Sequence, residues 1–254
     1  MSESFDAIVL GGGAAGLMCA VEAGKRGRRV VVLERSNSIG KKILISGGGR
    51  CNFTNIHSQT ENFISRNPHF AKSVLARYTP SDFLALVRGH HIAYQEKTLG
   101  QLFCDRSARD IVQMLETECQ RADVRVVTGV AINEVQRSSD FVVRTERDQY
   151  CARALVVATG GVSVPRTGAT SFGYDLARRF GIKVRDPWPA LVPLVLSSED
   201  RAQYCDLAGV STEGNSFMRE TVISRKDAGH ASWPEWSRNL ANLNLLHRWS
   251  SHFH

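Results

Sequence analysis

The sequence predicts an α/β fold in which helices pack against a parallel sheet, and three stretches support that prediction. Residues 5–10, FDAIVL, are an apolar run of the kind that forms a buried parallel strand. A helix-like stretch follows, and then a second apolar run at residues 28–34. The run ALVVATGG at residues 154–161 has the same character, so we expect several neighbouring parallel strands.

The first turn carries the pattern Gly11-x-Gly13-x-x-Gly16 between the first strand and the helix. Gly11 permits a tight turn, Gly13 lets the backbone approach a pyrophosphate, and Gly16 lets the helix pack closely on the strand. Ala14 and Ala15 complete the loop where the helix begins, and the free N–H groups of a helix N-terminus attract phosphate. The pattern predicts a dinucleotide site, with a purely structural turn as the alternative.

Glu34 closes the second strand, 23 residues after Gly11. An acid at this place accepts hydrogen bonds from the two hydroxyls of an adenosine ribose, and it disfavours a ribose that carries a 2′-phosphate. Strand, glycines, helix, second strand and acid together predict an adenine dinucleotide.

The next stretch, GKKILISGGGRCNFTN at residues 40–55, favours a flavin dinucleotide over a nicotinamide one. Its apolar part is strand-like. Lys41 and Lys42 are expected to face a pyrophosphate, with solvent exposure as the alternative. Bare backbone at Gly47–Gly49 fits against a flavin ring, although a flexible loop is the alternative. Arg50 is expected near the end of the ring where negative charge collects on reduction, or else in a structural salt bridge.

Six stretches together resemble the BaiN/RdsA-like family of NAD(P)/FAD-dependent oxidoreductases: GGGAAGLMCA, GKKILISGGGRCNFTN, EKTLGQLFC, ALVVATGG, GATSFGYDLARRFG and PALVPL. The resemblance runs from about residue 5 to about residue 211. It implies a Rossmann-type FAD-binding lobe with a parallel sheet, followed by the start of an inserted second domain. It also implies hydride transfer by a flavin, FAD as the cofactor and a small-molecule substrate of unknown identity, and it leaves NAD(P)H open as a co-substrate.

The cofactor contacts that the resemblance implies lie in the glycine-rich loops, after the second strand and at residues 159–161. They are Gly11, Gly13, Ala14, Ala15, Gly16, Glu34, Arg35, Lys41, Lys42, Ser46, Gly47, Gly48, Gly49, Arg50, Cys51, Asn52, Thr159, Gly160 and Gly161. Val130 is a further candidate because such lobes contact adenine through backbone groups at this place; a core valine is the alternative. Residues 96–105 are expected near the flavin by resemblance, while their composition alone predicts an irregular loop.

The middle of the chain alternates between helical and strand-like patterns. Two short helices are expected before and after a break at Thr79–Ser81, and an amphipathic helix is expected to start with Asp105 or Ser107 as its cap. The expected elements are helices in 68–91, 105–122 and 171–181, and strands in 124–138 and 141–146.

No residue stands out as a catalytic acid or base. His90 and His91 have no partner at metal-ligand spacing, so no metal site is expected. Cys51 and Cys104 lie nearest to the expected flavin, and buried, inert thiols are favoured there over a redox or covalent-flavin role.

The composition of the 254 residues, 43% hydrophobic and 22% charged, is that of a soluble protein. The chain has no signal-peptide pattern and no membrane-spanning run, and its six cysteines lack paired spacing, so we expect a cytoplasmic protein without a membrane partner. The formal net charge is +7, but no basic stripe interleaved with aromatic residues is evident. We therefore expect an anionic cofactor rather than a nucleic-acid partner. A flavoprotein that modifies tRNA is kept as an alternative.

The C-terminal stretch departs from the resemblance. We expect a flavin-binding lobe at 1–190, the start of an inserted domain at 191–213, and a tail at 214–254 that is translated out of frame. The tail holds three of the four Trp and four of the eight His. Back-translation of residues 226–243, read one base later, permits KMLVTHRGLSGPAILQIS, which resembles a motif of the family. A non-catalytic remnant or dinucleotide-binding fragment is therefore the alternative to an enzyme, and we expect weak retention of flavin.

The coding DNA tests the frameshift hypothesis near residues 211–214. The codons of Arg238, Asn239 and Asn242 are expected to yield Ala, Ile and Ile one base later. Codons that cannot give these three residues would rule out a shifted frame, and sequencing the gene is sufficient to read them.

Overall fold

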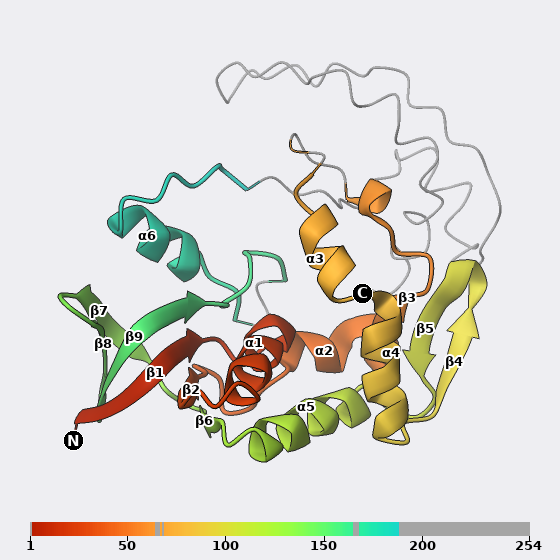
Figure 1. Cartoon of the computed structure of the whole chain (residues 1–254), viewed down its shortest axis with the longest axis horizontal. Helices are drawn as coiled ribbons and strands as arrows, with labels where there is room; N and C mark the ends of the chain where they lie inside the picture. Colours follow the sequence, from red (N-terminus) through yellow and green to blue (C-terminus); the bar gives the residue numbers. More distant parts are fainter. Residues whose placement is uncertain (1, 64–66, 68, 165–167, 188–254) are drawn as a thin grey trace, which may run out of the picture. The chain divides into compact units, whose positions relative to one another are not determined.

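The computed structural model describes residues 2–63, 67, 69–164 and 168–187, and Figure 1 shows their helices and strands. The chain divides into a unit from Met1 to Arg185 and a second from Asp186 to His254. This division lies five residues before the domain end expected at 190. The expected inserted domain at 191–213 and the tail at 214–254 lie outside the described residues.

A sheet of six strands, in the order β6-β2-β1-β9-β8-β7, forms the centre of the first unit. Four neighbouring strands are parallel, and β8 and β7 extend the sheet as an antiparallel hairpin. The α/β class with a parallel sheet is thus confirmed, with the addition of this hairpin. The strands are β1 (Ser2–Leu10), β2 (Val30–Leu33), β6 (Arg125–Val127), β7 (Ile132–Arg137), β8 (Phe141–Thr145) and β9 (Gln149–Val157).

Both faces are buried at residues 8–10 of β1 and throughout β2, which explains why these residues are continuously apolar. On one face, Val9 and Val32 lie in a core with Leu17 of α1 (Ala14–Gly24) and Leu115 of α5 (Arg109–Arg121). The side chains that alternate with these along the strands, such as Ile8 and Leu33, point to the other face. There they share a second core with residues of β8 and β9 and with Leu176 of α6 (Phe172–Arg179). Figure 1 shows α1 and α5 lying together beside β2 and β6.

A second, antiparallel sheet of three strands follows the order β3-β5-β4, with β3 (Asn52–Asn55), β4 (Tyr94–Lys97) and β5 (Gln101–Cys104). It corrects the irregular loop expected at 96–105. The strands are only four residues long, too short for a pattern to show, and packing holds them in place. Phe53 contacts the ring of Tyr94 edge-on at 5.9 Å between centroids, and Leu102 and Cys104 are fully buried.

Residues 41–45, expected as strand-like, form the short helix α2 (Lys41–Ile45) instead. Gly40 begins it in the left-handed region at φ +69°, and Leu44 N–H donates to Gly40 O. A Cβ at Gly40 would come within 2.7 Å of Val112 on α5, so the glycine also permits close packing of α2 on α5. Burial of Ile43 in that contact decides the helix over a strand.

The two helices expected in 68–91 are confirmed as α3 (Lys72–Arg77) and α4 (Pro80–Gly89). Thr79 starts α4 with a capping box, since its hydroxyl accepts from Asp82 N–H while Asp82 accepts from Thr79 N–H. Helix α5 is capped at Ala108 rather than at Asp105 or Ser107, although Ser107 Oγ accepts from Arg109 N–H. Three short 3₁₀ turns complete the described elements: Ser46–Gly49, Thr60–Asn62 and Thr98–Gly100.

Glu118 of α5 ties three helices together. Its side chain is 6% exposed and pairs with Lys25 Nζ after α1 at 2.8 Å, with His90 Nε2 after α4 at 2.9 Å and with Arg121 Nη1 at 2.9 Å. Burial alone would raise the pKa of Glu118, but the hydrogen bonds from Lys25, His90 and Arg121 outweigh burial and lower it to about 2. The carboxylate is therefore charged at every physiological pH.

Replacing this carboxylate tests its contribution to stability. We expect Glu118→Gln to lower the free energy of unfolding at pH 7 by about 3 kcal/mol, because the buried cluster loses its only anion. The folded pKa lies below the unfolded one, so the contribution is complete above pH 4.5 and is lost as pH falls toward 2. The difference between the variant and the original chain should shrink over that range in urea titrations.

The matched control is Glu22→Gln, which breaks the exposed pair with Arg26. It should cost at most about 0.5 kcal/mol. Equal unfolding midpoints for Glu118→Gln and the original chain at pH 7 would contradict the role of Glu118.

Candidate functional site

The first glycine loop is closed on one side and open on the other. Gly11 has φ +110°, and a Cβ there would lie 2.5 Å from Ala158 O. A Cβ on Gly16 would lie 1.9 Å from Gly11 O, so both positions require glycine. A Cβ on Gly13, in contrast, would meet no atom within 4 Å. The exposed residues Ala14 and Ala15 begin α1 beside this open space, where the first N–H groups of the helix are available to an anion.

Glu34 holds this loop as well as facing the expected ribose position. Its Oε2 accepts from Gly12 N–H and its Oε1 accepts from Ser36 N–H, both at 2.7 Å. A carboxylate has about four acceptor positions, so two remain for ribose hydroxyls. Val130 N–H donates to Glu34 O at 3.0 Å, which brings the expected adenine-contacting residue beside the acid. The sequence indicated the ribose role but gave no signal for the fastening of the loop.

The second glycine loop is ordered rather than flexible. Gly47, Gly48 and Gly49 all have left-handed φ angles, of +57°, +64° and +81°. Gly49 O accepts from Ala108 N–H at 2.7 Å, and Ser46 O accepts from Cys51 N–H at 3.0 Å. These hydrogen bonds favour a defined turn over the flexible loop that was the alternative for this stretch.

The surface of this second loop is also open on one side. A Cβ on Gly47 would meet the Phe103 ring at 2.7 Å, so Gly47 packs against the small sheet. A Cβ on Gly48 would meet nothing within 4 Å, and one on Gly49 only Leu44 O at 3.9 Å. Bare backbone with free space beside it is what the close approach of a flat ring requires.

Arg50 and Asn52 flank the loop and are exposed. Arg50 O accepts from Cys104 N–H at 2.9 Å, so the backbone of Arg50 is fixed. Within the described ranges, no carboxylate forms an ion pair with its guanidinium, which does not favour the structural salt bridge. Ser46 Oγ donates to Ile43 O at 2.7 Å and fastens the loop to α2.

The carboxyl end of β9 lies beside the first glycine loop and is reached by Lys42. Lys42 Nζ donates to Ser163 Oγ at 3.1 Å and to Gly161 O at 3.4 Å. The hydroxyl of Thr159 is buried without a hydrogen-bond partner among the described residues, and Gly160 has φ +75°. The structure thus brings residues 159–161 and Lys42 together, as the resemblance implied for one site.

Two further residues of this edge escaped the sequence analysis. Tyr174 Oη lies 2.9 Å from the place of a Cβ on Gly161, and Ser163 Oγ holds Lys42. The only signal in the sequence for Ser163 and Tyr174 as site residues is that they follow the ATGG segment, within residues 159–174. Arg35 and Lys41 are less well supported, since Arg35 Nη2 donates to Gly168 O at 3.0 Å and Lys41 is simply exposed.

The cysteines near the second glycine loop are buried. Cys51 is 5% exposed and Cys104 fully buried. Burial raises the pKa of the Cys51 thiol, and burial together with the neighbouring Cys51 and Asp110 raises the pKa of Cys104 to about 12. Thiols that stay protonated at neutral pH are poor nucleophiles, so the expected inert role is supported. Among the described residues, Cys19, Cys51, Cys104 and Cys119 are free thiols.

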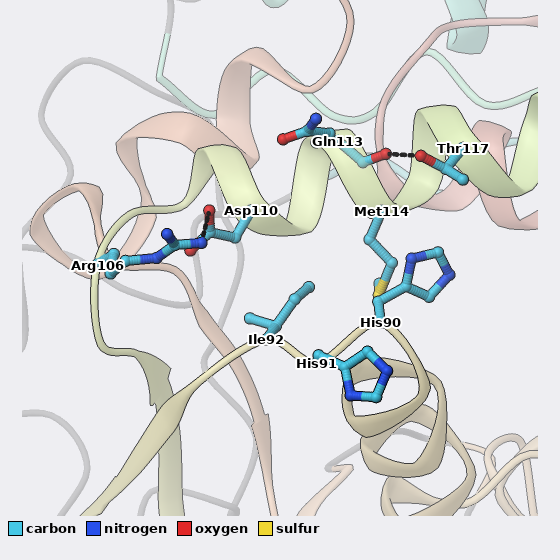
Figure 2. Close-up of a pocket in the computed structure, with 8 residues that line it drawn as sticks. All are labelled: His90, His91, Ile92, Arg106, Asp110, Gln113, Met114 and Thr117. Atoms are coloured by element: carbon cyan, nitrogen blue, oxygen red, sulfur yellow. Dashed lines mark hydrogen bonds and ion pairs between the residues drawn. The ribbon is translucent and has the colours of Figure 1, made fainter.

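A separate polar hollow of about 260 Å³ lies between the end of α4 and α5, and Figure 2 shows its lining. None of the residues expected at the cofactor lines it, and His90 there is engaged with Glu118. Across the described part of the chain, no group of three or more His, Cys, Asp or Glu side chains could hold a metal ion. The lining residues are His90, His91, Ile92, Arg106, Asp110, Gln113, Met114 and Thr117.

Residues 5–226 match the family model of the HI0933-like protein Rossmann domain. The chain belongs to this family. The predicted membership in a family of flavin-dependent oxidoreductases is confirmed. The match runs to residue 226, past the place near 211 where we expected the resemblance to stop.

Three curated relatives show what this family contains. Proteins named ribosomal RNA dihydrouridine synthase, from Haemophilus influenzae and Escherichia coli, are 45% and 42% identical over 89% and 87% of this chain. A 3-dehydro-bile acid delta(4,6)-reductase from Clostridium scindens is 32% identical over 81% of the chain. The alignments cover 59%, 57% and 50% of these relatives, so the chain spans little more than half of their length.

These names correct one expectation. The sequence predicted no nucleic-acid partner, yet two relatives above 40% identity are named for ribosomal RNA. The prediction relied on the absence of a basic, aromatic stripe in the linear sequence. Which side chains are exposed to solvent in the folded chain cannot be read from the linear sequence. As to the membrane, no helix in the described residues has the length and apolar character to cross one.

The open face of the second glycine loop can be tested with a matched pair of substitutions. Gly48→Ala places a methyl group into the space expected to hold the flavin and should weaken FAD affinity roughly tenfold or more, because close approach is lost. Gly27→Ala is the control, since Gly27 has φ +71° and equally open surroundings but lies in the turn after α1. Quenching of flavin fluorescence on titration gives both dissociation constants.

Each substitution costs a similar backbone strain of roughly 1–2 kcal/mol, so strain cancels in the comparison. Equal FAD affinities for the two variants would show that the outer face of Gly48 does not contact the flavin.

Proposed function

We propose that this chain is the FAD-binding part of a reductase that acts on uridine in ribosomal RNA. The observation that carries the proposal is the turn at Gly47–Gly49, in which the backbone of Gly48 and Gly49 faces open space. Lys42, a few residues earlier, reaches the carboxyl edge of the sheet. The substrate class is supported by the two relatives named ribosomal RNA dihydrouridine synthase.

The residues present fit FAD at each of its parts. The open space at Gly13 suits a pyrophosphate at the start of α1, and the remaining acceptor positions of Glu34 suit the ribose. Val130, held beside Glu34 through its N–H, would contact the adenine through its backbone carbonyl. The bare backbone of Gly48 and Gly49 suits a flat ring.

The names of the relatives share one reaction class. Dihydrouridine differs from uridine by two hydrogens across a C=C bond conjugated to a carbonyl, and a delta(4,6) 3-dehydro steroid also carries C=C bonds conjugated to a ketone. A bound reduced flavin supplies a hydride to such a bond, with NAD(P)H as the proposed source of electrons. A proton must reach the second carbon.

This chain's own residues would position and stabilise charge. Lys42, held by Ser163 and Gly161, places a cation at the edge of the sheet that is expected to face the pyrophosphate. Arg50, exposed and fixed through its backbone, would neutralise negative charge that collects at the polar edge of the ring. The buried thiols of Cys51 and Cys104 stay protonated and keep nucleophilic side reactions out of the site.

A small enone substrate is the second candidate, favoured by the 32% identity to the bile acid reductase. It agrees with the small-molecule substrate that the resemblance implied. The two candidates share the reaction class and differ in the partner, so a direct comparison of substrates separates them. FAD binding without turnover of either would support the non-catalytic fragment.

The assay uses the 254-residue chain reconstituted with FAD, NADH or NADPH, and unmodified ribosomal RNA or a steroid dienone. We expect NAD(P)H oxidation that depends on RNA and a gain of two hydrogens in digested nucleosides by mass spectrometry. Arg50→Ala should lower the rate roughly tenfold or more, because a cation near developing negative charge is removed. Arg147→Ala, in the turn between β8 and β9, is the control and should leave the rate unchanged.

Reduction of the dienone together with inert RNA would overturn the RNA assignment and favour the second candidate. A rate loss in Arg147→Ala equal to that in Arg50→Ala would remove Arg50 from the mechanism.

A further inference from the structure

The segment around α3 combines aromatic and basic residues without acids. Between Glu61 and Asp82 the sequence holds no Asp or Glu, while Lys72 and Arg77 are basic. Phe63, Phe70 and Tyr78 supply three aromatic rings over the same stretch. This is the aromatic and basic pattern that the sequence analysis did not recognise.

The structure turns the apolar side of this helix outward. Val74 on α3 and the flanking residues Phe70 and Tyr78 are exposed, with fractions of 62%, 70% and 37%, and Tyr78 follows the helix with extended backbone. The adjoining side of the segment carries buried Ala71 and half-buried Leu75, which hold the helix to the protein. Hydrogen bonds from Leu75 N–H to Ala71 O and from Tyr78 N–H to Val74 O, each 3.0 Å, extend the helical pattern of α3 at both ends.

Phe63 adds a further half-exposed ring in the segment that leads from β3 to α3, the orange helix of Figure 1. We call Phe63, Phe70, Lys72, Val74, Arg77 and Tyr78 the α3 surface. Contiguous exposed apolar groups are disfavoured in water and usually mark an interaction site. The charges that accompany them decide which partner fits.

Lys72 and Arg77 are the cations of the α3 surface, whereas at its Tyr78 end burial, and then the charges of Glu22, Asp82 and Glu118, raise the pKa of Tyr78. A hydrogen bond from Thr60 is the main cause that lowers the pKa of Glu61. The positive charge of Lys72 lowers this pKa further, to a smaller extent. Asp82 is engaged in the capping box with Thr79 and lies at the start of α4. Arg77 therefore provides the least compensated positive charge of the α3 surface.

We propose that the α3 surface binds single-stranded RNA. Bases stack on Phe70 and its neighbouring rings, and Arg77 with Lys72 contacts the phosphates. Aromatic rings next to cations are the arrangement that proteins use for single strands, since every base has a stacking face and every nucleotide a negative charge. The proposal rests on the RNA substrate proposed above and places its docking surface outside the flavin site.

Binding of the full chain to a fluorescein-labelled oligouridylate of about 20 nucleotides, followed by anisotropy, tests the proposal. Phe70→Ala should weaken binding roughly fivefold or more through the lost stack. Arg77→Ala should reduce the slope of log K against log salt by about 0.7, because one phosphate contact disappears. Ile182→Ala, 60% exposed near the end of α6, and Arg147→Ala are the controls and should bind like the original chain.

Thermal melts of all four variants check folding, and sedimentation checks self-association. Unchanged RNA binding in both Phe70→Ala and Arg77→Ala, with the original chain binding well, overturns the α3 surface and leaves the proposed function intact. An original chain that binds no RNA overturns the RNA substrate and this proposal together. A change in self-association without a change in RNA binding shows a protein interface instead and also overturns the proposal.

Discussion

The carboxylate of Glu34 is the constraint on which the candidate site depends. It joins the end of β2 to the loop between β1 and α1, through paired bonds to Gly12 N–H and Ser36 N–H. Without those bonds, the N–H groups of Gly12 and Ser36 would lack these hydrogen-bond acceptors, and the glycine loop would have no fixed distance from β2. Gly12 O in turn accepts from Gly40 N–H, so the same loop also positions the start of α2. One side chain therefore sets the relative places of both glycine-rich turns.

Close backbone contacts extend this arrangement. Gly16 approaches Gly11 O, and Gly11 approaches Ala158 O, so β1, α1 and the end of β9 meet with no side chain between them. Such close backbone contacts can be predicted from sequence, because they require glycine, and glycines at fixed spacing are a strong local signal. This is why the parallel strands and the glycine turn between β1 and α1 were predicted correctly, while the cofactor roles of the loop and of Glu34 stay predictions.

Other features depend on packing and could not be read in the same way. Residues 41–45 have a strand-like composition, yet their contact with Val112 on α5 makes them helical. The hairpin of β4 and β5 is too short to show a period, and Leu102 is buried in the middle strand of the small sheet, between β3 and β4. The exposed side of α3 carries apolar residues at ordinary helical spacing, so the sequence alone gives it the appearance of a core-facing helix. Only exposure in the folded chain reveals that these apolar residues face outward.

Helix α5 connects two features that are distant in the sequence. Near its N-terminal end, Ala108 N–H donates to Gly49 O of the second glycine loop, and near its C-terminal end Glu118 gathers Lys25, His90 and Arg121. A rigid helix transmits a displacement at one end to the other. Substitutions around Glu118 would consequently change flavin affinity without any contact to the flavin. Because the pKa of Glu118 is about 2, mild acidification leaves this carboxylate charged, so cofactor loss that reports on the ion cluster would be expected only below about pH 4.5.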